Sequence, residues 1–211
     1  MMLITILNKF FQIFIGLLLS PIILLSCLII IIVEKKNPIF IQERVGLNRK
    51  IFKIIKLRTM IDNKVTKLGY YMRKCRLDEF PQIINVIKGD MNFIGPRPII
   101  KSEYEIDPSV FSKEESNKNF VFLPIESEKL YDRVKVLPGI TGWAQINGPL
   151  KNQIIRLEYD MYYIKNKSFL LDLSIILYTI RTFLTGKRLG DYSKQKPSNI
   201  SNLKPNDITI L

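Results

Sequence analysis

A long apolar run near the N-terminus limits what this chain can fold into. Residues 10–33 read FFQIFIGLLLSPIILLSCLIIIIV, and Lys9 is the only charged side chain among residues 1–33. A run of this length can cross a bilayer, so a straight spanning helix is the simplest interpretation. A cleaved secretory signal fits less well, because the apolar stretch is too long. We therefore predict a membrane anchor over residues 1–36.

A proline divides this run into two arms. Pro21 lacks a backbone donor and should bend the helix near Ser20, whose hydroxyl can bond a carbonyl that the bend frees. At about 1.5 Å per residue the arms span about 16 and about 20 Å, each nearer to half of the hydrocarbon core than to all of it. Lysines flank both ends of the run. We therefore favour a re-entrant helix-break-helix over a spanning helix, with the rest of the chain on the cytoplasmic face of the inner membrane.

Composition restricts the chemistry of the remaining chain. The 211 residues carry a net charge of +13 and contain no histidine. Acid–base or nucleophilic roles must then fall to other side chains, and a metal ion would be a hard one such as magnesium or manganese. The two cysteines form neither a disulfide framework nor a zinc pattern. No nucleic-acid module accompanies the basic charge, so we expect no nucleic acid partner.

The sequence after the anchor predicts a helix-rich α/β domain over residues 37–186, followed by a mobile polar tail over 187–211. Residues 39–57 indicate a β-hairpin that turns near Gly46. We predict helices over 66–76, 81–88 and 153–165, the second with Pro81 in its first turn and Gly89 as its stop. Residues 101–132 have little pattern and form a predicted variable insertion. The apolar stretch 168–184 is either core or an interfacial amphipathic helix.

An adjacent carboxylate pair is the first candidate for chemistry. Asp78 and Glu79 follow Arg73, and Phe80-Pro81 makes their surroundings rigid and partly apolar. The predicted helix start at this position would favour bound anions through its dipole. Arg97 adds a guanidinium group between two prolines. Acidic residues near guanidinium groups and rigid turns suit a phosphate ester with a divalent cation, although a solvated pair and a structural turn arginine remain the simpler alternatives.

Two further cations and one acid are weaker candidates. Lys56 and Arg58 lie two apart on the second predicted strand, so their side chains share a face. That face either helps to hold the same polyanion or is only solvated. We interpret Asp90 as a cap of the turn after Gly89.

Several ordered blocks together resemble the bacterial sugar transferases, the monotopic polyprenyl-phosphate phosphoglycosyl transferases. The resemblance covers about residues 10–185, and the fitting order of its blocks makes it specific. The blocks are Ser20-Pro21, Lys56 to Met60, Leu77 to Gln82, Asn85-Val86, Lys88 to Met91, Gly95 to Pro98 and Pro138 to Gly148.

The resemblance implies a mechanism and a set of partners. Asp78 would be the nucleophile that attacks the β-phosphate of a UDP-sugar and expels UMP, and the phosphosugar would then pass to polyprenyl phosphate, with undecaprenyl phosphate as the expected carrier. Glu79 fits as a metal-associated or positioning acid, with Asp78 and Glu79 the expected contacts of Mg²⁺ or Mn²⁺. The expected phosphate holders are Arg73 and Arg97, with Lys56 and Arg58 as weaker ones. The reaction would begin assembly of a membrane glycan.

Two departures and two alternatives accompany this resemblance. The family often has an arginine after Asn-Gly in the last block, where this chain has Pro149. The stretch between Pro98 and Pro138 is longer than in compact members, which bears on sugar choice, partner docking or contacts in a homo-oligomer. The alternatives are direct transfer without a covalent intermediate, and a non-catalytic membrane scaffold that binds nucleotide-sugar or lipid.

Overall fold

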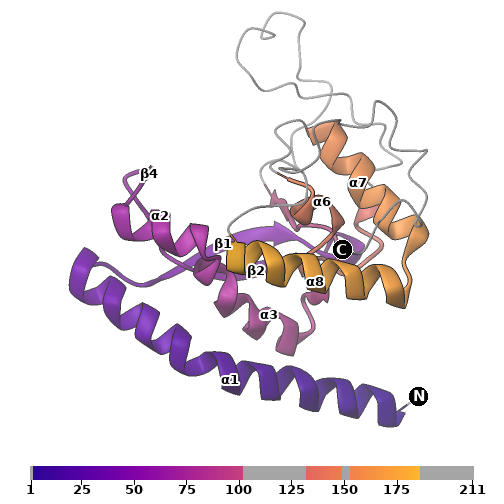
Figure 1. The fold of residues 1–211 in the computed structure, drawn as a ribbon, viewed down its shortest axis with the longest axis horizontal. Helices are drawn as coiled ribbons and strands as arrows, with labels where there is room; N and C mark the ends of the chain where they lie inside the picture. Colours follow the sequence, from indigo (N-terminus) through magenta and orange to yellow (C-terminus); the bar gives the residue numbers. More distant parts are fainter. Residues whose placement is uncertain (1, 102–131, 149–152, 186–211) are drawn as a thin grey trace, which may run out of the picture. The chain divides into compact units, whose positions relative to one another are not determined.

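The computed structural model describes residues 2–101, 132–148 and 153–185 and places them in two compact units (Figure 1). One unit combines Met1–Arg44 with Phe52–Asn92, and the other combines Val45–Ile51 with Phe93–Leu211. The long N-terminal helix therefore lies in the same compact unit as residues 52–92 of the predicted catalytic domain. The predicted insertion at 101–132, the departure at Pro149 and the polar tail at 187–211 lie essentially outside the described residues.

The first unit begins with a single long helix, α1 (Met2–Glu34), which contains Pro21. Ser20 Oγ donates to the carbonyl of Leu17 at 2.8 Å. This carbonyl lies four residues before Pro21, so it is the acceptor that the missing proline N–H leaves unbonded. The predicted use of the Ser20 hydroxyl is thus confirmed. The predicted break into two helices is not present, because α1 continues through the proline, and Figure 1 shows only a gentle bend along its length.

One stripe of α1 packs against the rest of its unit. Gln12, Ser26 and Ile30 are buried at helical spacing, and Ile30 joins Leu57 and Met72 in a small core. Gly16 lies where α1 meets α3 (Ile83–Lys88), because a Cβ there would reach Ile87 Cδ1 at 3.0 Å. The remaining large apolar side chains along the helix are mostly exposed.

The predicted hairpin is present. It consists of β1 (Ile39–Val45) and β2 (Ile51–Leu57), joined by the 3₁₀ turn η1 (Leu47–Arg49). Positive φ angles at Asn48 and Arg49 reverse the chain within this turn. The sheet has the order β2-β1-β6, with β6 at Ile99–Ile100. A second, two-residue hairpin pairs β3 (Met60–Ile61) with β4 (Lys64–Val65).

Three short helical segments complete the first unit. Thr66 caps α2 (Lys67–Lys74) by accepting from the Gly69 N–H, close to the predicted helix start. The predicted helix 81–88 needs a correction, because residues Leu77–Gln82 form the 3₁₀ segment η2 and α3 begins only at Ile83. Gly89 ends α3 with a φ of 85°, as predicted for a left-handed helix stop.

The second unit packs two helices over short strands. Strand β5 (Asn92–Ile94) pairs with β7 (Gly139–Thr141), which leads into α6 (Trp143–Ile146). Helices α7 (Gln153–Asn166) and α8 (Phe169–Thr185) follow, near the predicted bounds. Trp143 and Ile146 share a core with Tyr159, Tyr163 and Ile175.

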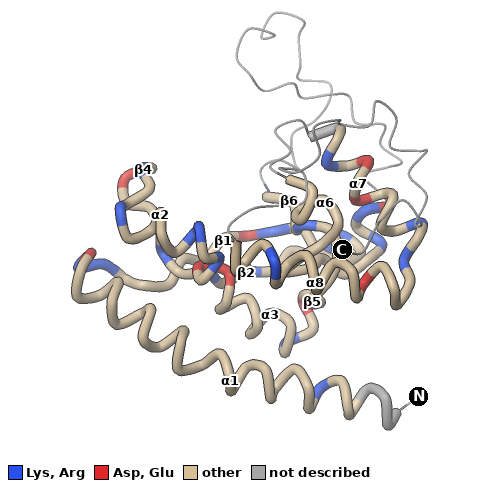
Figure 2. The backbone as a smooth tube through the Cα atoms, viewed as in Figure 1, with Lys and Arg blue, Asp and Glu red and all other residues tan. Residues whose placement is uncertain are grey.

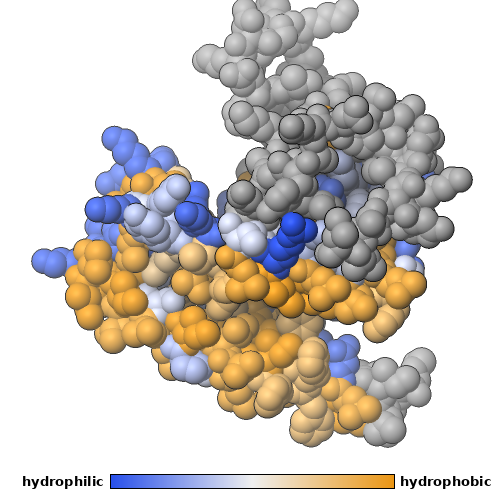
Figure 3. Space-filling model, in the orientation of Figure 1, coloured by the Kyte–Doolittle hydropathy of each residue, from blue (hydrophilic) through white to orange (hydrophobic). Residues whose placement is uncertain are grey.

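Helix α8 combines both predictions made for residues 168–184. Leu171 and Ile175 are buried in the core of the second unit. The other face is apolar but exposed, with Phe169, Leu170 and Leu184 at least 75% exposed. Figure 3 shows apolar surface along α8 and also along α1. One face of α8 is therefore core, and the other is free to contact an apolar environment.

Candidate functional site

The carboxylate pair lies in a tight turn between α2 and α3. Asp78 and Glu79 belong to η2, which follows Arg76 in the left-handed conformation at a φ of 52°. A non-glycine residue in this conformation is uncommon and is held there by its surroundings. The Arg76 carbonyl accepts from the Glu79 N–H at 3.2 Å. The chain therefore fixes both acids by backbone geometry, in a 3₁₀ turn where the sequence predicted a helix start.

Cations surround the two acids. Lys56 Nζ lies 3.5 Å from Glu79 Oε1, and Arg76 Nη1 lies 3.9 Å from Glu79 Oε2. Arg73 is fixed on α2, where its Nε donates to Thr59 Oγ1 at 2.8 Å. Figure 2 shows basic and acidic positions meeting between α2 and α3, whereas α1 is almost free of charge along its length. Three cations thus oppose two acids, and this excess of positive charge suits an anionic ligand.

Asp78 has the electrostatics of a reactive carboxylate. Burial is the largest cause of a rise in its pKa from 3.8 to about 6, and the neighbouring Glu79 charge adds to this rise. Lys56 and Arg73 act in the opposite direction and lower the pKa. The anion is therefore poorly solvated but still the main form at pH 7. Strongly shifted carboxylates of this kind are typical of functional sites.

Arg58 occupies a different environment from the other predicted phosphate holders. Its Nε donates to the carbonyl of Asn37 at 2.7 Å, and its Nη2 donates to the carbonyl of Ile39 at 3.3 Å. These bonds tie the end of β2 to the start of β1. The structure thus gives Arg58 a role in closing the hairpin, and its contact with phosphate stays a prediction.

Asn85 is a structural residue of the site that the sequence reasoning left without a role. It is 1% exposed, accepts from the Ile55 N–H at 3.1 Å and donates to the Lys53 carbonyl at 2.8 Å. Its amide therefore binds the edge of β2 as a neighbouring strand would. The Asp90 N–H donates to the Asn85 carbonyl at 2.9 Å, a backbone bond of the turn after Gly89. A capping role for the Asp90 side chain stays a prediction. A polar residue within the apolar segment IINVI was the available signal.

Arg97 belongs to the second unit, in a loop that two other segments fix. The Gly139 N–H donates to the Pro96 carbonyl at 2.9 Å, and the Gly95 N–H donates to the Thr141 carbonyl at 2.9 Å. A Cβ on Gly139 would overlap the backbone nitrogen of Gly95, so only glycine permits this approach. The predicted non-helical conformation at 95–98 is confirmed, and these two bonds restrain its backbone.

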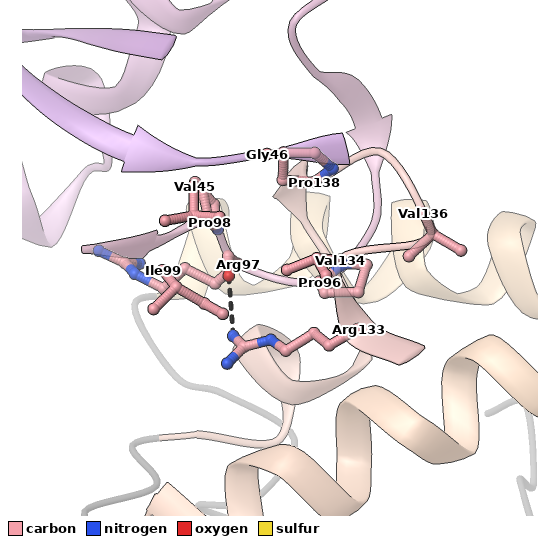
Figure 4. Close-up of a pocket in the computed structure, with 10 residues that line it drawn as sticks. All are labelled: Val45, Gly46, Pro96, Arg97, Pro98, Ile99, Arg133, Val134, Val136 and Pro138. Carbon is pink, nitrogen blue, oxygen red and sulfur yellow. Dashed lines mark hydrogen bonds between the residues drawn. The ribbon is translucent and has the colours of Figure 1, made fainter. Parts of the chain in front are cut away.

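A small pocket lies beside Arg97 within the second unit (Figure 4). Its walls are mainly proline and valine, with two arginines; they comprise Val45, Gly46, Pro96, Arg97, Pro98, Ile99, Arg133, Val134, Val136 and Pro138. Figure 4 shows the Arg133 side chain directed at the backbone of Arg97, while the Arg97 guanidinium points away from Arg133.

Asp78 and Glu79 suit a metal ion that substrate and water also bind, and do not suit one enclosed by protein side chains alone. Among the described residues, no group of three or more acidic or cysteine side chains could hold a metal ion. Magnesium, however, is commonly held by one or two carboxylates and takes its other oxygens from substrate phosphates and water. Asp78 and Glu79 fit this second mode, because their adjacent carboxylates provide oxygen donors only.

Comparison with known proteins assigns the family. The family model described as "Bacterial sugar transferase" matches residues 1–186. The chain belongs to this family. It is therefore a transferase, and the family resemblance found in its motifs is confirmed.

Relatives of this sugar transferase carry related names. It is 35% identical to "Uncharacterized sugar transferase EpsL" of Bacillus subtilis, over 80% of this chain and 81% of that protein. It is 38% identical to "UDP-N-acetylgalactosamine-undecaprenyl-phosphate N-acetylgalactosaminephosphotransferase" of Aeromonas hydrophila, over 80% of this chain and 40% of that protein. It is 36% identical to "UDP-glucose:undecaprenyl-phosphate glucose-1-phosphate transferase" of Escherichia coli, over 78% of this chain and 36% of that protein. The sugar transferase thus spans well under half the length of the two relatives whose names state a reaction.

Proposed function

We propose that this sugar transferase moves a sugar 1-phosphate from a UDP-sugar to polyprenyl phosphate, with undecaprenyl phosphate as the carrier, and releases UMP. The family and the reactions named for the relatives support the general reaction. The observation that supports the catalytic part is Asp78, a half-buried carboxylate whose pKa is raised to about 6, beside Lys56 and Arg73. The product would begin assembly of a membrane glycan.

The proposed chemistry has two displacement steps at one phosphorus atom. An Asp78 carboxylate oxygen forms a bond to the β-phosphorus of the UDP-sugar, and the bond to the bridging oxygen breaks, so UMP leaves with that oxygen. A phosphate oxygen of the polyprenyl carrier then attacks the same phosphorus and displaces the Asp78 carboxylate. The aspartyl phosphate is a mixed anhydride and hence a reactive phosphoryl donor. A poorly solvated carboxylate also loses little hydration on attack.

Repulsion between the carboxylate and the diphosphate is the main obstacle to the first step. Lys56, Arg73 and Arg76 provide cationic groups near the acids, and hydrogen bonds or ion pairs hold each of them in place. Fixed cations stabilise charge that develops on the phosphoryl oxygens. Asp78 and Glu79 are the residues that would hold a magnesium ion, which when bound supplies further positive charge to the diphosphate.

The contacts of α1 support a re-entrant anchor with both ends on one face of the membrane. Residues 6–34 are long and apolar enough to cross a bilayer by length and composition. Near one end, Lys9 Nζ donates to the Ile87 carbonyl at 2.7 Å, and near the other Ile30 packs on Leu57 and Met72. These ends are about 30 Å apart, roughly the thickness of the hydrocarbon core. A helix that crossed the bilayer would place one of its ends on the far side, away from the unit that both ends contact.

The exposed apolar face of α8 supports a further contact with the membrane interface. Its exposed side chains include Phe169, Leu173, Ile176 and Ile180, which recur at helical spacing. This face would lie among lipid headgroups and upper acyl chains on the cytoplasmic side of the inner membrane. The reaction would then take place at the depth where the phosphate of the lipid carrier lies.

Two assays with the purified full chain test the proposal. UMP release from a panel of UDP-sugars, with undecaprenyl phosphate and magnesium, separates a transferase from a non-catalytic scaffold. Exchange of labelled UMP into UDP-sugar without the lipid acceptor separates covalent from direct transfer. We expect Asp78→Asn to lose turnover by at least about a thousandfold and to abolish the exchange. An active Asp78→Asn enzyme would refute the nucleophile assignment.

A further inference from the structure

Arg133 makes two short contacts within the second unit. Its Nη2 donates to the backbone carbonyl of Arg97 at 2.7 Å and lies 2.9 Å from Asp160 Oδ2 on α7 (Figure 4). One guanidinium group therefore connects the largely buried loop at 95–98 to a buried carboxylate. Nothing in the function proposed above gives either residue a role.

Burying the Asp160 carboxylate costs desolvation free energy, so the ion pair is not explained by stability alone. Its side chain is 1% exposed, and burial raises its pKa, while Arg133 and then Arg156 lower it. Buried ion pairs often contribute little net stability, because desolvation offsets most of the attraction. The pair nevertheless keeps the Arg133 guanidinium beside Asp160, because separating the two groups would leave a buried charge unpaired. Geometry at the Arg97 loop is thus the more specific consequence of this pair.

Two consecutive carbonyls of the loop at 95–98 accept hydrogen bonds from different residues. The Pro96 carbonyl accepts from Gly139, and the Arg97 carbonyl accepts from Arg133. Prolines on both sides restrict the φ angles of the loop. With its backbone fixed in this way, Arg97 presents its guanidinium away from Arg133, as Figure 4 shows.

We infer that Arg133, anchored on Asp160, is a positioning residue that holds Arg97 in the conformation that binds a substrate phosphate. The inference rests on the proposed function, and on the role of Arg97 as a phosphate holder that the family resemblance predicts. Arg133 acts through the Arg97 backbone and makes no phosphate contact of its own. The pair would set how well Arg97 is preorganised, since a fixed donor loses less entropy on binding.

A double-mutant cycle on the full chain tests this inference, with UDP and magnesium as the ligand in titration calorimetry. In Arg133→Lys the charge near Asp160 remains, but the lysine ammonium cannot reproduce the planar guanidinium. We expect UDP to bind about tenfold more weakly, the scale of one charge-assisted hydrogen bond. In the Arg97→Ala background the same change should alter the dissociation constant less than about twofold, because its effect passes through Arg97.

Two further variants guard against a purely structural effect. Arg133→Met with Asp160→Asn removes both charges of the pair together, so neither partner is left as an unpaired charge. This double variant should keep a wild-type melting temperature within a few degrees and still weaken UDP binding. Asp132→Asn is the matched control, because it breaks the exposed Lys135–Asp132 pair of the same segment. It should leave UDP binding unchanged.

Several outcomes would overturn the inference. They are an unchanged dissociation constant in both Arg133 variants, an equal loss in the wild-type and Arg97→Ala backgrounds, and no UDP binding by the wild-type chain. A wild-type chain that shows the expected coupling but releases no UMP from any UDP-sugar would refute the proposed function and leave the positioning role intact.

Discussion

At the scale of single residues, ionised Asp78 lowers the free energy of unfolding. Its pKa of about 6 in the folded protein exceeds the ordinary value of 3.8, and burial is the main cause. Ionisation is thus less favourable in the folded than in the unfolded chain. The resulting loss of stability develops as pH rises from about 4 to about 6 and is complete above that range.

This linkage predicts that Asp78→Asn is inactive but more stable at neutral pH. The amide removes the poorly solvated charge, so we expect a gain of about 1 to 2 kcal/mol at pH 7.5, a value reduced from the full pKa shift because the side chain is partly accessible. That gain corresponds to a melting temperature higher by roughly 2 to 8 °C. Thermal unfolding in detergent measures it, with the difference from wild type expected to vanish near pH 4. A less stable variant at pH 7.5 would contradict the electrostatic account.

Lys56 provides a test of the same pKa through catalysis. Its positive charge lowers the pKa of Asp78, so Lys56→Met should raise that pKa above about 6. If the ionised carboxylate attacks, the acid limb of the profile of kcat/KM against pH should move to higher pH by about half a unit to one unit. UMP release measured from pH 5 to 9 gives this profile.

Two further variants test the direction in which the acid limb of the pH profile moves. Glu79→Gln removes a charge that raises the pKa of Asp78, so any residual activity should have its acid limb at lower pH. Lys53→Met is the matched control, since Lys53 is an exposed lysine on the same strand. Its profile should coincide with that of the wild type. Movement of the limb in the same direction for Lys56→Met and Glu79→Gln would rule out Asp78 as the titrating group.

At the scale of elements, the sequence was informative wherever a local rule decides the structure. Gly89 ends α3 because a left-handed stop favours glycine, and Pro96 and Pro98 keep the loop at 95–98 out of a helix. The 3₁₀ segment at Asp78 escaped the sequence reasoning because Pro81 is compatible with the first turn of either helix type. The roles of Asn85 and Arg133 depend on partners 27 or more residues away, which no local pattern specifies.

Asn85 should contribute strongly to stability, because its side chain joins α3 to the edge of β2. In Asn85→Asp the side chain can still accept from the Ile55 N–H, but it loses its bond to the Lys53 carbonyl and brings a charge near Asp90. We expect a loss of about 3 kcal/mol in unfolding free energy, since a buried carbonyl and a buried charge are both left unpaired. Chemical denaturation in detergent measures this loss.

A surface asparagine provides the comparison for Asn85. Asn166 also donates to a backbone carbonyl, that of Tyr162, but at an exposed position. Asn166→Asp should therefore change stability by less than about 1 kcal/mol. Equal effects at the two positions would show that the amide of Asn85 is not what holds α3 to the strand.

At the scale of the whole molecule, the exposure pattern of α1 decides between a core helix and an embedded one. Buried positions follow one stripe through Gln12, Ser26 and Ile30, while side chains such as Phe10, Leu17 and Leu24 are more than 65% exposed. Apolar exposure on this scale is not stable in water. Lipid is the environment that suits it, and the packed stripe ties both ends of the helix to one unit.

Cysteine labelling tests the topology that follows from this packing. In a chain with Cys27→Ala and Cys75→Ala, single cysteines are placed before and after the apolar run as Asn8→Cys and Lys36→Cys. A third chain with only Cys27→Ala keeps the exposed native Cys75 as the reporter for the catalytic face. We expect a membrane-impermeant maleimide to label all three cysteines in inverted inner-membrane vesicles and none of them in intact spheroplasts.

The result at position 8 carries the argument, because every topology leaves Lys36 beside the catalytic unit. A straight crossing would place Asn8→Cys on the periplasmic face, where it would be labelled in spheroplasts and protected in inverted vesicles. That crossing would also separate Lys9 from the Ile87 carbonyl, so Lys9→Met would have no effect on stability. With both ends on one face, the Lys9 bond persists, and Lys9→Met should destabilise the chain by about 1 kcal/mol. Agreement of the labelling and stability results would establish that the helix enters and leaves the membrane on the side where the chemistry takes place.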